Sequence, residues 1–149
     1  MIETLSEVEV HDLLDRQVVG RLGCHHDGFT YVVPVIYARL DDAIVFYTTE
    51  GLKVELLRAN PSVCFEIDEY DELGGWQSVI IQGTASEVSG DDAKAVLSAL
   101  AERFARRRAE RSTGEGQRPR AEGRAPVAVS IAIEALTGRK VAREAYTRA

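Results

Sequence analysis

The sequence predicts a single domain that is mainly β, a small barrel of antiparallel strands with helices at its sides. A chain of 149 residues suits one domain with a substantial core. Short runs of alternating apolar residues recur along it, and several are joined by tight turns that favour antiparallel pairing. So many short strands in one domain are typical of a sheet that closes on itself.

The chain begins with a predicted helix and a hairpin. Ser6 and Glu9 have the spacing of a capping box, so a short helix should follow to about residue 15. Residues 17–24 predict a strand, and a turn is expected at 25–28 because Asp-Gly tolerates positive φ. Consecutive strand residues point to opposite faces, so the run "CHHD" (24–27) converges poorly on one ion, and no metal site is predicted.

The second predicted strand, 29–40, contains Pro34 near its middle. Proline cannot donate to a β-ladder, so it indicates an edge, a bulge or a place where pairing stops. A third strand, 43–49, ends in two threonines and leads straight into a short helix, 51–60, which Asn60 and Pro61 should end.

The second half of the chain alternates in the same way. Its predicted elements are strands at 62–70, 76–88 and 125–136 and an amphipathic helix at 89–108. Gly83 indicates a bend or the close approach of another backbone. The segment 108–124 is rich in Gly, Arg and Glu and is expected to be a mobile loop, while 137–140 should begin a polar tail.

The charge is unevenly distributed. The net charge is −6, yet residues 102–124 hold eight arginines and four glutamates, a sum of +4, which leaves 10 basic and 20 acidic residues, or −10, elsewhere. An acidic body disfavours general nucleic-acid binding, which depends on phosphate neutralisation. No apolar run approaches the ~18–20 residues of a membrane span, and the start lacks a signal-peptide pattern, so the expected location is the cytoplasm.

The junction between strand 43–49 and the following helix combines groups that bind anions. Thr48 and Thr49 bring hydroxyls, the first helical turn exposes free amides at the positive end of its dipole, and Lys53 adds an ammonium. Gly51 lets a ligand approach the backbone closely, so the set suits a terminal phosphate. Alternatively, Thr49 merely caps the helix, or the carboxylate of Glu50 occupies the positive end itself.

Several common catalytic motifs are missing from the sequence. The sequence has no Walker-type glycine loop, no Gly-x-Ser-x-Gly elbow and no His-Glu-x-x-His pair. A triphosphate ligand and a hydrolase are therefore not expected, and no catalytic residue is assigned.

Two stretches resemble a known family. "YVVPVIYARLDDAIVFYTTEGLKVELLRANPSVCFEID" and "WQSVIIQGTASEV" are similar to the pyridoxamine 5′-phosphate oxidase-like flavin-binding split barrels, and within them to the small bacterial subgroup that includes the nitroimidazole-resistance proteins. The similarity covers roughly residues 5–89, and the ending at 131–140 is in keeping with it.

The resemblance implies a six-stranded split β-barrel that forms a homodimer, with FMN in a cleft at the subunit interface. It also implies that Thr48, Thr49 and Lys53 hold the ribityl phosphate. The isoalloxazine ring would lie along the mid-strand proline, where a flavin edge replaces a neighbouring strand. The implied ring contacts are Val33, Pro34 and Val35, with Trp76, Gln77 and Ser78 from the facing strand, within the chain or across the dimer.

The implied function is that of a flavin-dependent reductase or oxidase acting on a small molecule. The alternative is a non-enzymatic protein that binds flavin, or a deazaflavin or haem, which some relatives hold in the same cleft. The true oxidases carry basic residues on the strand that corresponds to 31–37 and an arginine where Leu52 stands here. Oxidation of pyridoxamine 5′-phosphate is therefore not the reaction we expect.

Overall fold

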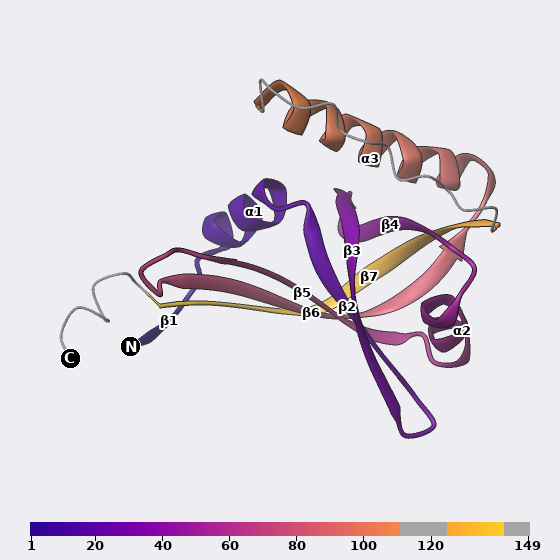
Figure 1. Ribbon diagram of the computed structural model, residues 1–149, viewed down its shortest axis with the longest axis horizontal. Coiled ribbons are helices and arrows are strands. Elements are labelled where there is room, and N and C mark those ends of the chain that lie inside the picture. The colour runs from indigo at the N-terminus through magenta and orange to yellow at the C-terminus, as the bar shows by residue number, and fades with distance from the viewer. Residues whose placement is uncertain (111–124, 142–149) are drawn as a thin grey trace.

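The computed structural model describes residues 1–110 and 125–141 (Figure 1). Its elements in chain order are β1 (Ile2–Thr4), α1 (Glu7–Arg16), β2 (Val19–His26), β3 (Phe29–Leu40), β4 (Ala43–Thr49), α2 (Leu52–Ala59), β5 (Ser62–Tyr70), β6 (Trp76–Val88), α3 (Gly90–Glu110) and β7 (Pro126–Val141). No helix in these ranges combines the length and apolar character that a membrane span requires.

The strands form one antiparallel sheet that closes into a ring. The order is β1-β7-β4-β3-β2-β5-β6, and β6 also pairs with β7, so six strands make a barrel and β1 lies outside it. The predicted six-stranded barrel is therefore confirmed. Among the described residues the ring leaves few unpaired strand edges, and one stretch of unpaired edge lies between β3 and β4.

Helix α1 begins as the sequence predicts. The amide of Ser6 donates to Glu9 Oε2 at 2.8 Å, and the amide of Glu9 donates to Ser6 Oγ at 3.2 Å, which is a complete capping box. The helix buries Val10, Leu13 and Leu14 against the barrel.

The β2–β3 hairpin turns at two residues only. Asp27 and Gly28 have φ values of 50° and 75°, the two positive angles that a tight Asp-Gly hairpin turn needs. The predicted turn at 25–28 is thus too long by two residues, because His25 and His26 still pair with Thr30 and Phe29. The hairpin extends away from the body of the barrel (Figure 1).

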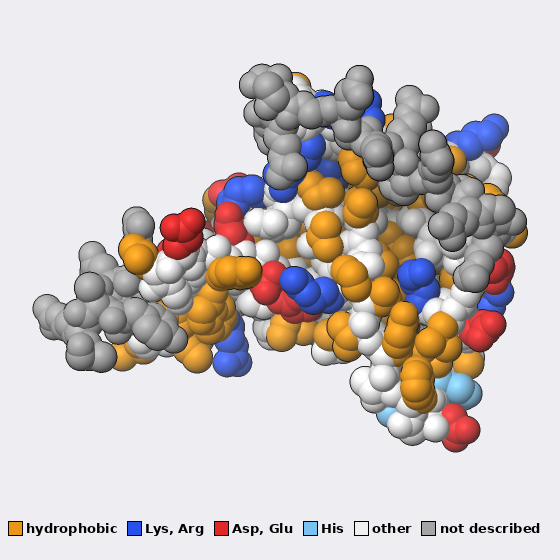
Figure 2. Space-filling view, viewed as in Figure 1, with side chains coloured by type: hydrophobic (Ala, Val, Ile, Leu, Met, Phe, Trp, Pro, Cys, Tyr) orange, Lys and Arg blue, Asp and Glu red, His pale blue; other side chains and the backbone are white. Residues whose placement is uncertain are grey.

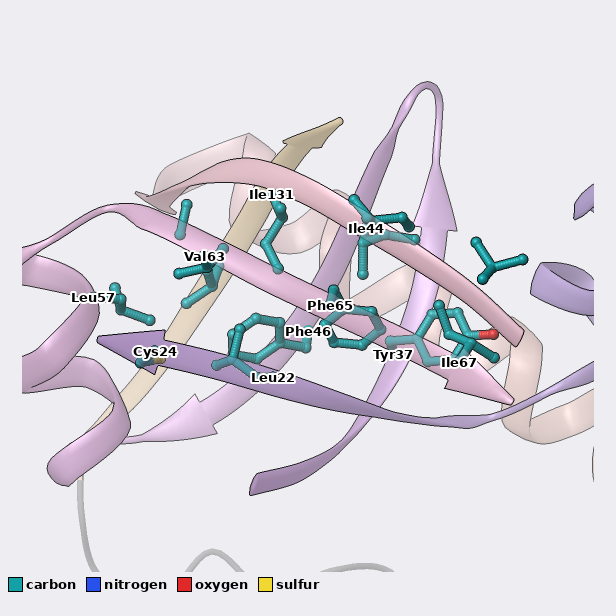
Figure 3. Packing of buried hydrophobic residues seen from close by; sticks show 14 of the residues in the cluster. Leu22, Cys24, Tyr37, Ile44, Phe46, Leu57, Val63, Phe65, Ile67 and Ile131 are labelled. Carbon is teal, nitrogen blue, oxygen red and sulfur yellow. The ribbon is translucent and has the colours of Figure 1, made fainter. Parts of the chain in front are cut away.

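Large side chains fill the barrel interior (Figure 3). Tyr37, Phe46 and Phe65 are fully buried, and the rings of Tyr37 and Phe65 meet edge to face with centroids 5.4 Å apart. A second cluster forms where α3 packs Val96 and Leu100 on the outer faces of β3, β4 and β7.

Strand β7 corrects two predictions. The expected polar tail at 137–140 is wrong, because these residues continue the strand to Val141, held between β6 and the unpredicted β1. Residues 108–110 of the loop predicted at 108–124 belong to α3 instead. The rest of that prediction, 111–124, lies outside the described residues. The close approach predicted at Gly83 is confirmed, since an added Cβ would stand 2.3 Å from Ala132 O, next to a register shift.

Candidate functional site

The barrel opens between β3 and β4. The last residues of β3, Tyr37 to Leu40, pair with β4, but residues 29–36 pair with β2 alone. The end of β4, Tyr47 to Thr49, pairs with β7 on its other side. Within the described ranges, the facing edges of these two segments therefore have no strand partner.

Pro34 lies on this open edge. The Tyr37 amide donates to Val18 O at 3.0 Å, and hydrogen-bonded pairs alternate along an antiparallel ladder, so the pair Arg21–Pro34 is a non-hydrogen-bonded one. The nitrogen and carbonyl of Pro34 consequently face the opening, whereas the polar backbone groups of Val33 and Val35 face β2. The side chains of these two valines pack against the core, and Pro34 is exposed.

Helix α2 starts beside this opening without a side-chain cap. Its N-cap is Gly51, and no side chain of residues 1–110 or 125–141 caps the amides of the first turn. The alternative in which Thr49 caps the helix is therefore wrong. Thr48 and Thr49 are both half-buried, but strand alternation places Thr48 on the barrel side with Phe46 and Thr49 on the opposite side.

Lys53 is half-buried in the first turn of α2 and reaches toward the β2–β3 hairpin. Burial raises the pKa of the Cys24 thiol, and the nearby ammonium of Lys53 opposes that rise. Cys24 pairs with Tyr31, two residues before Val33, so Lys53 lies near the strand pair that carries the open edge of β3. No carboxylate of residues 1–110 or 125–141 forms an ion pair with Lys53.

Arg58, which the sequence analysis did not single out, binds the carboxylate of Glu50. Arg58 Nη1 and Nη2 donate to the two carboxylate oxygens of Glu50 at 2.8 and 2.7 Å, and Nε donates to Glu87 Oε1 at 2.7 Å. The hydrogen bonds from Arg58 lower the pKa of Glu50. The signal was present in the sequence as an arginine in the last turn of a short helix, two turns after the glutamate.

The other predicted ring contacts lie far from this corner in the same chain. Thr48 pairs with Val127 and Trp76 pairs with Val141, so 141 − 127 = 14 positions of β7 separate them, roughly 45 Å of extended strand. Gln77 and Ser78 follow Trp76 on β6, and Ser78 Oγ donates to Glu66 Oε1 at 3.1 Å. One chain alone does not bring these two groups of residues together.

Hydrophobic side chains gather along the face that β2 and β3 present beside the opening (Figure 2). Val32 and Phe29, both on β3, are 64% and 51% exposed. A hollow of about 610 Å³ borders the same strands through Thr30, Val32 and Arg21. None of the nine predicted cofactor residues lines it. In the described part of the chain, no three His, Cys, Asp or Glu side chains gather as a metal ion requires.

The comparisons with known proteins agree with this architecture. A FAD-binding protein of Mesorhizobium loti is 31% identical, with a TM-score of 0.74 over 95% of this chain and 99% of that one. A candidate 5-nitroimidazole antibiotic resistance protein of Bacteroides thetaiotaomicron has a TM-score of 0.74 at 15% identity over 94% and 89%. A FAD- and haem-binding protein of Mycobacterium smegmatis has a TM-score of 0.66 at 22% identity over 92% and 71%. The last two likenesses show the fold alone.

A curated relative, an uncharacterised protein of Rhizobium meliloti, is 28% identical over 87 residues, which make up 58% of each chain. The sequence profile described as pyridoxamine 5′-phosphate oxidase matches residues 6–140, nearly the whole chain. With its closed ring of six strands and an opening between β3 and β4, the chain belongs to the pyridoxamine 5′-phosphate oxidase family.

Proposed function

We propose that the protein binds a flavin nucleotide, FMN, at the opening between β3 and β4. The phosphate would lie at the corner formed by Thr48, the first-turn amides of α2 and Lys53. The side chain of Thr49 points to the opposite side of the strand from that of Thr48. The observation that supports this most is that α2 begins uncapped beside a lysine that has no carboxylate partner in the described ranges. Free amides, a positive dipole end and an ammonium are the groups that hold a phosphate.

The isoalloxazine ring would lie along the open edge of β3. Pro34 turns its nitrogen and carbonyl to that edge, and because it has no N–H it adds no unsatisfied donor at its own position, where a flat ring would replace a strand. Val33 and Val35 would hold the strand in place by packing against the core. Carbonyl groups on this edge can accept from the ring, which fixes its orientation.

The second half of the site would come from another copy of the chain. Trp76, Gln77 and Ser78 lie at the far end of β6, so in a homodimer they can meet the cofactor of the partner. The exposed apolar side chains along β2 and β3 are the kind of surface that such an interface covers.

A bound flavin would supply the redox chemistry by accepting and delivering a hydride, and the protein would supply binding and orientation. We therefore propose a reductase or oxidase of a small molecule. Arg21, which is paired with Pro34, donates to Asp68 at 3.0 Å and to Glu66 at 3.3 Å. Because its charge is already neutralised, Arg21 does not offer a place for the phosphate of pyridoxamine 5′-phosphate.

The alternative is a protein that binds the cofactor without turnover. The FAD- and haem-binding protein of Mycobacterium smegmatis, which has the same fold, is the reason to test this alternative. FAD shares its inner phosphate with FMN, and a deazaflavin or haem could use the same opening. Extraction of the purified protein followed by chromatography and absorption spectroscopy distinguishes these cofactors. We expect FMN, and a higher melting temperature in excess FMN. No flavin uptake and an unchanged melting temperature would reject the proposal.

Turnover is tested separately on the flavin-loaded protein. We expect reduced nicotinamide cofactors to bleach the flavin absorbance and a panel of electron acceptors to restore it. Tight flavin binding without either change identifies the non-enzymatic alternative.

A further inference from the structure

Glu50 is the residue most able to compete with a phosphate for the start of α2. It directly precedes the N-cap, Gly51, and the positive end of a helix attracts any carboxylate nearby. In this chain the carboxylate is turned the other way, onto the guanidinium of Arg58.

The contact between Arg58 and Glu50 has a defined geometry. Two parallel hydrogen bonds, 2.8 and 2.7 Å long, join the guanidinium to both carboxylate oxygens, the bidentate arrangement that fixes both groups most firmly. On its other side Arg58 is anchored to β6, with Nε 2.7 Å from Glu87 Oε1. Arg58 therefore links the start of α2, the last turn of α2 and the end of β6.

We propose that Arg58 is a positioning residue for the flavin phosphate, because it holds the carboxylate of Glu50 away from the uncapped amides of α2 and from Lys53. This inference rests on the proposed function. Arg58 itself does not touch the phosphate: it stands five residues after Lys53, which places it about 140° around the helix from the lysine.

A ligand pair that differs only in the phosphate tests this role. FMN carries the phosphate and riboflavin lacks it, so the ratio of their dissociation constants isolates the phosphate contribution. The variants are R58M, E50Q and the double variant R58M/E50Q. E87Q is the matched control, since it loosens the anchor on β6 and leaves the bond between Arg58 and Glu50 intact. Flavin fluorescence titrations at neutral pH give both constants, and melting temperatures report the fold.

In R58M the carboxylate of Glu50 loses both hydrogen bonds from Arg58, and its charge near the start of α2 should weaken FMN binding roughly tenfold, the order expected for a like charge a few ångströms from a phosphate at a solvated surface. Riboflavin binding should not change. In R58M/E50Q the neutral amide should restore FMN binding, and E50Q and E87Q alone should resemble the wild type.

Three results overturn the inference alone: unchanged affinities for both FMN and riboflavin in R58M, equal losses of affinity for the two ligands in R58M, or a double variant that binds FMN as weakly as R58M. The last two mean that Arg58 acts on the fold or attracts the phosphate directly. Wild-type protein that binds neither flavin rejects the proposed function, and this inference with it.

Discussion

The hydroxyl of Tyr37 donates a 2.7 Å hydrogen bond to the carbonyl oxygen of Leu14. Tyr37 is fully buried in β3, and Leu14 is near the end of α1, so the bond ties the first helix to the barrel. Arg103 of α3 donates to the same carbonyl at 2.7 Å, and its guanidinium lies 4.8 Å from the centre of the Tyr37 ring. One carbonyl thus joins β3, α1 and α3.

Replacing Tyr37 with Phe should reduce the free energy of unfolding by about 1 kcal/mol, the usual net value of a buried hydrogen bond. The loss stays small because Leu14 O keeps its bond from Arg103. Urea unfolding at pH 7 measures it. Tyr47→Phe, at a residue that is 39% exposed, is the control and should have no effect. If Y37F lost as little unfolding free energy as Y47F, the hydrogen bond from Tyr37 to Leu14 O would not stabilise the contact between β3 and α1.

The alkaline limit of stability should depend on the same residue. Burial raises the pKa of Tyr37 to about 12 from 10.0. The folded state therefore holds its proton longer than the unfolded chain, and stability falls as the pH rises from about 10 toward 12, by roughly 2–3 kcal/mol. Unfolding free energies of the wild type should fall over this range more steeply than those of Y37F. Parallel curves would show that another group sets the limit.

The loss of stability at low pH should depend on Glu9. Hydrogen bonds from Lys140 and from the Ser6 amide lower the pKa of Glu9 to about 2 from 4.5. A lowered pKa stabilises the fold above the ordinary value, and this contribution is lost as the pH falls from about 4.5 toward 2. Glu9→Gln should therefore be less stable than the wild type at pH 7, and the difference should vanish near pH 2. Glu7→Gln, whose side chain is 91% exposed, serves as the control.

Gly83 should not tolerate a side chain. An added Cβ would stand 2.3 Å from the backbone oxygen of Ala132 and 2.7 Å from Ile131 Cγ2, so the β6–β7 pairing would have to shift. We expect Gly83→Ala to cost about 1–3 kcal/mol, as overpacking does. Gly23→Ala is matched to it, because there the new Cβ would meet Cys64 Cβ at an ordinary 3.6 Å. Equal midpoints of urea unfolding for the two variants would refute the prediction.

Local patterns in the sequence were enough to predict most of the fold. The capping box at Ser6 and Glu9 predicted the start of α1, and the mid-strand Pro34 indicated an edge, a bulge or a place where pairing stops, of which the structure shows an edge. The polar residues 137–140 did not suggest a strand. They form one because β1 and β6 pair with both edges of β7, which is tertiary information that a local pattern does not contain.

The candidate site stays a prediction, and its parts differ in how far the sequence suggests them. Lys53 and the start of α2 follow from the residue types at one junction. The role of Arg58 does not, because only the fold brings the end of α2 against Glu50 and the end of β6. The distance between Thr48 and Trp76 likewise follows from the strand register of β7.

The proposed homodimer predicts complementation between two defective chains. If Lys53 of one chain and Trp76 of the other serve the same cofactor, Lys53→Met and Trp76→Ala proteins should each bind FMN weakly. A mixed dimer holds one intact site, so co-expressed chains with different affinity tags should regain part of the FMN content. Mixed dimers that bind no more FMN than the average of the two parents would place both residues in one chain's site, or Trp76 outside it.

The central claim is that the start of α2 and Lys53 hold the phosphate of a flavin. The most direct measurement is calorimetric titration of FMN and riboflavin into cofactor-free wild type and Lys53→Met. We predict that the wild type binds FMN more tightly than riboflavin, and that K53M loses most of this preference while its riboflavin affinity is unchanged, because only FMN offers the phosphate that Lys53 and the free amides bind. A full preference for FMN in K53M, or no flavin binding in the wild type, would contradict the account.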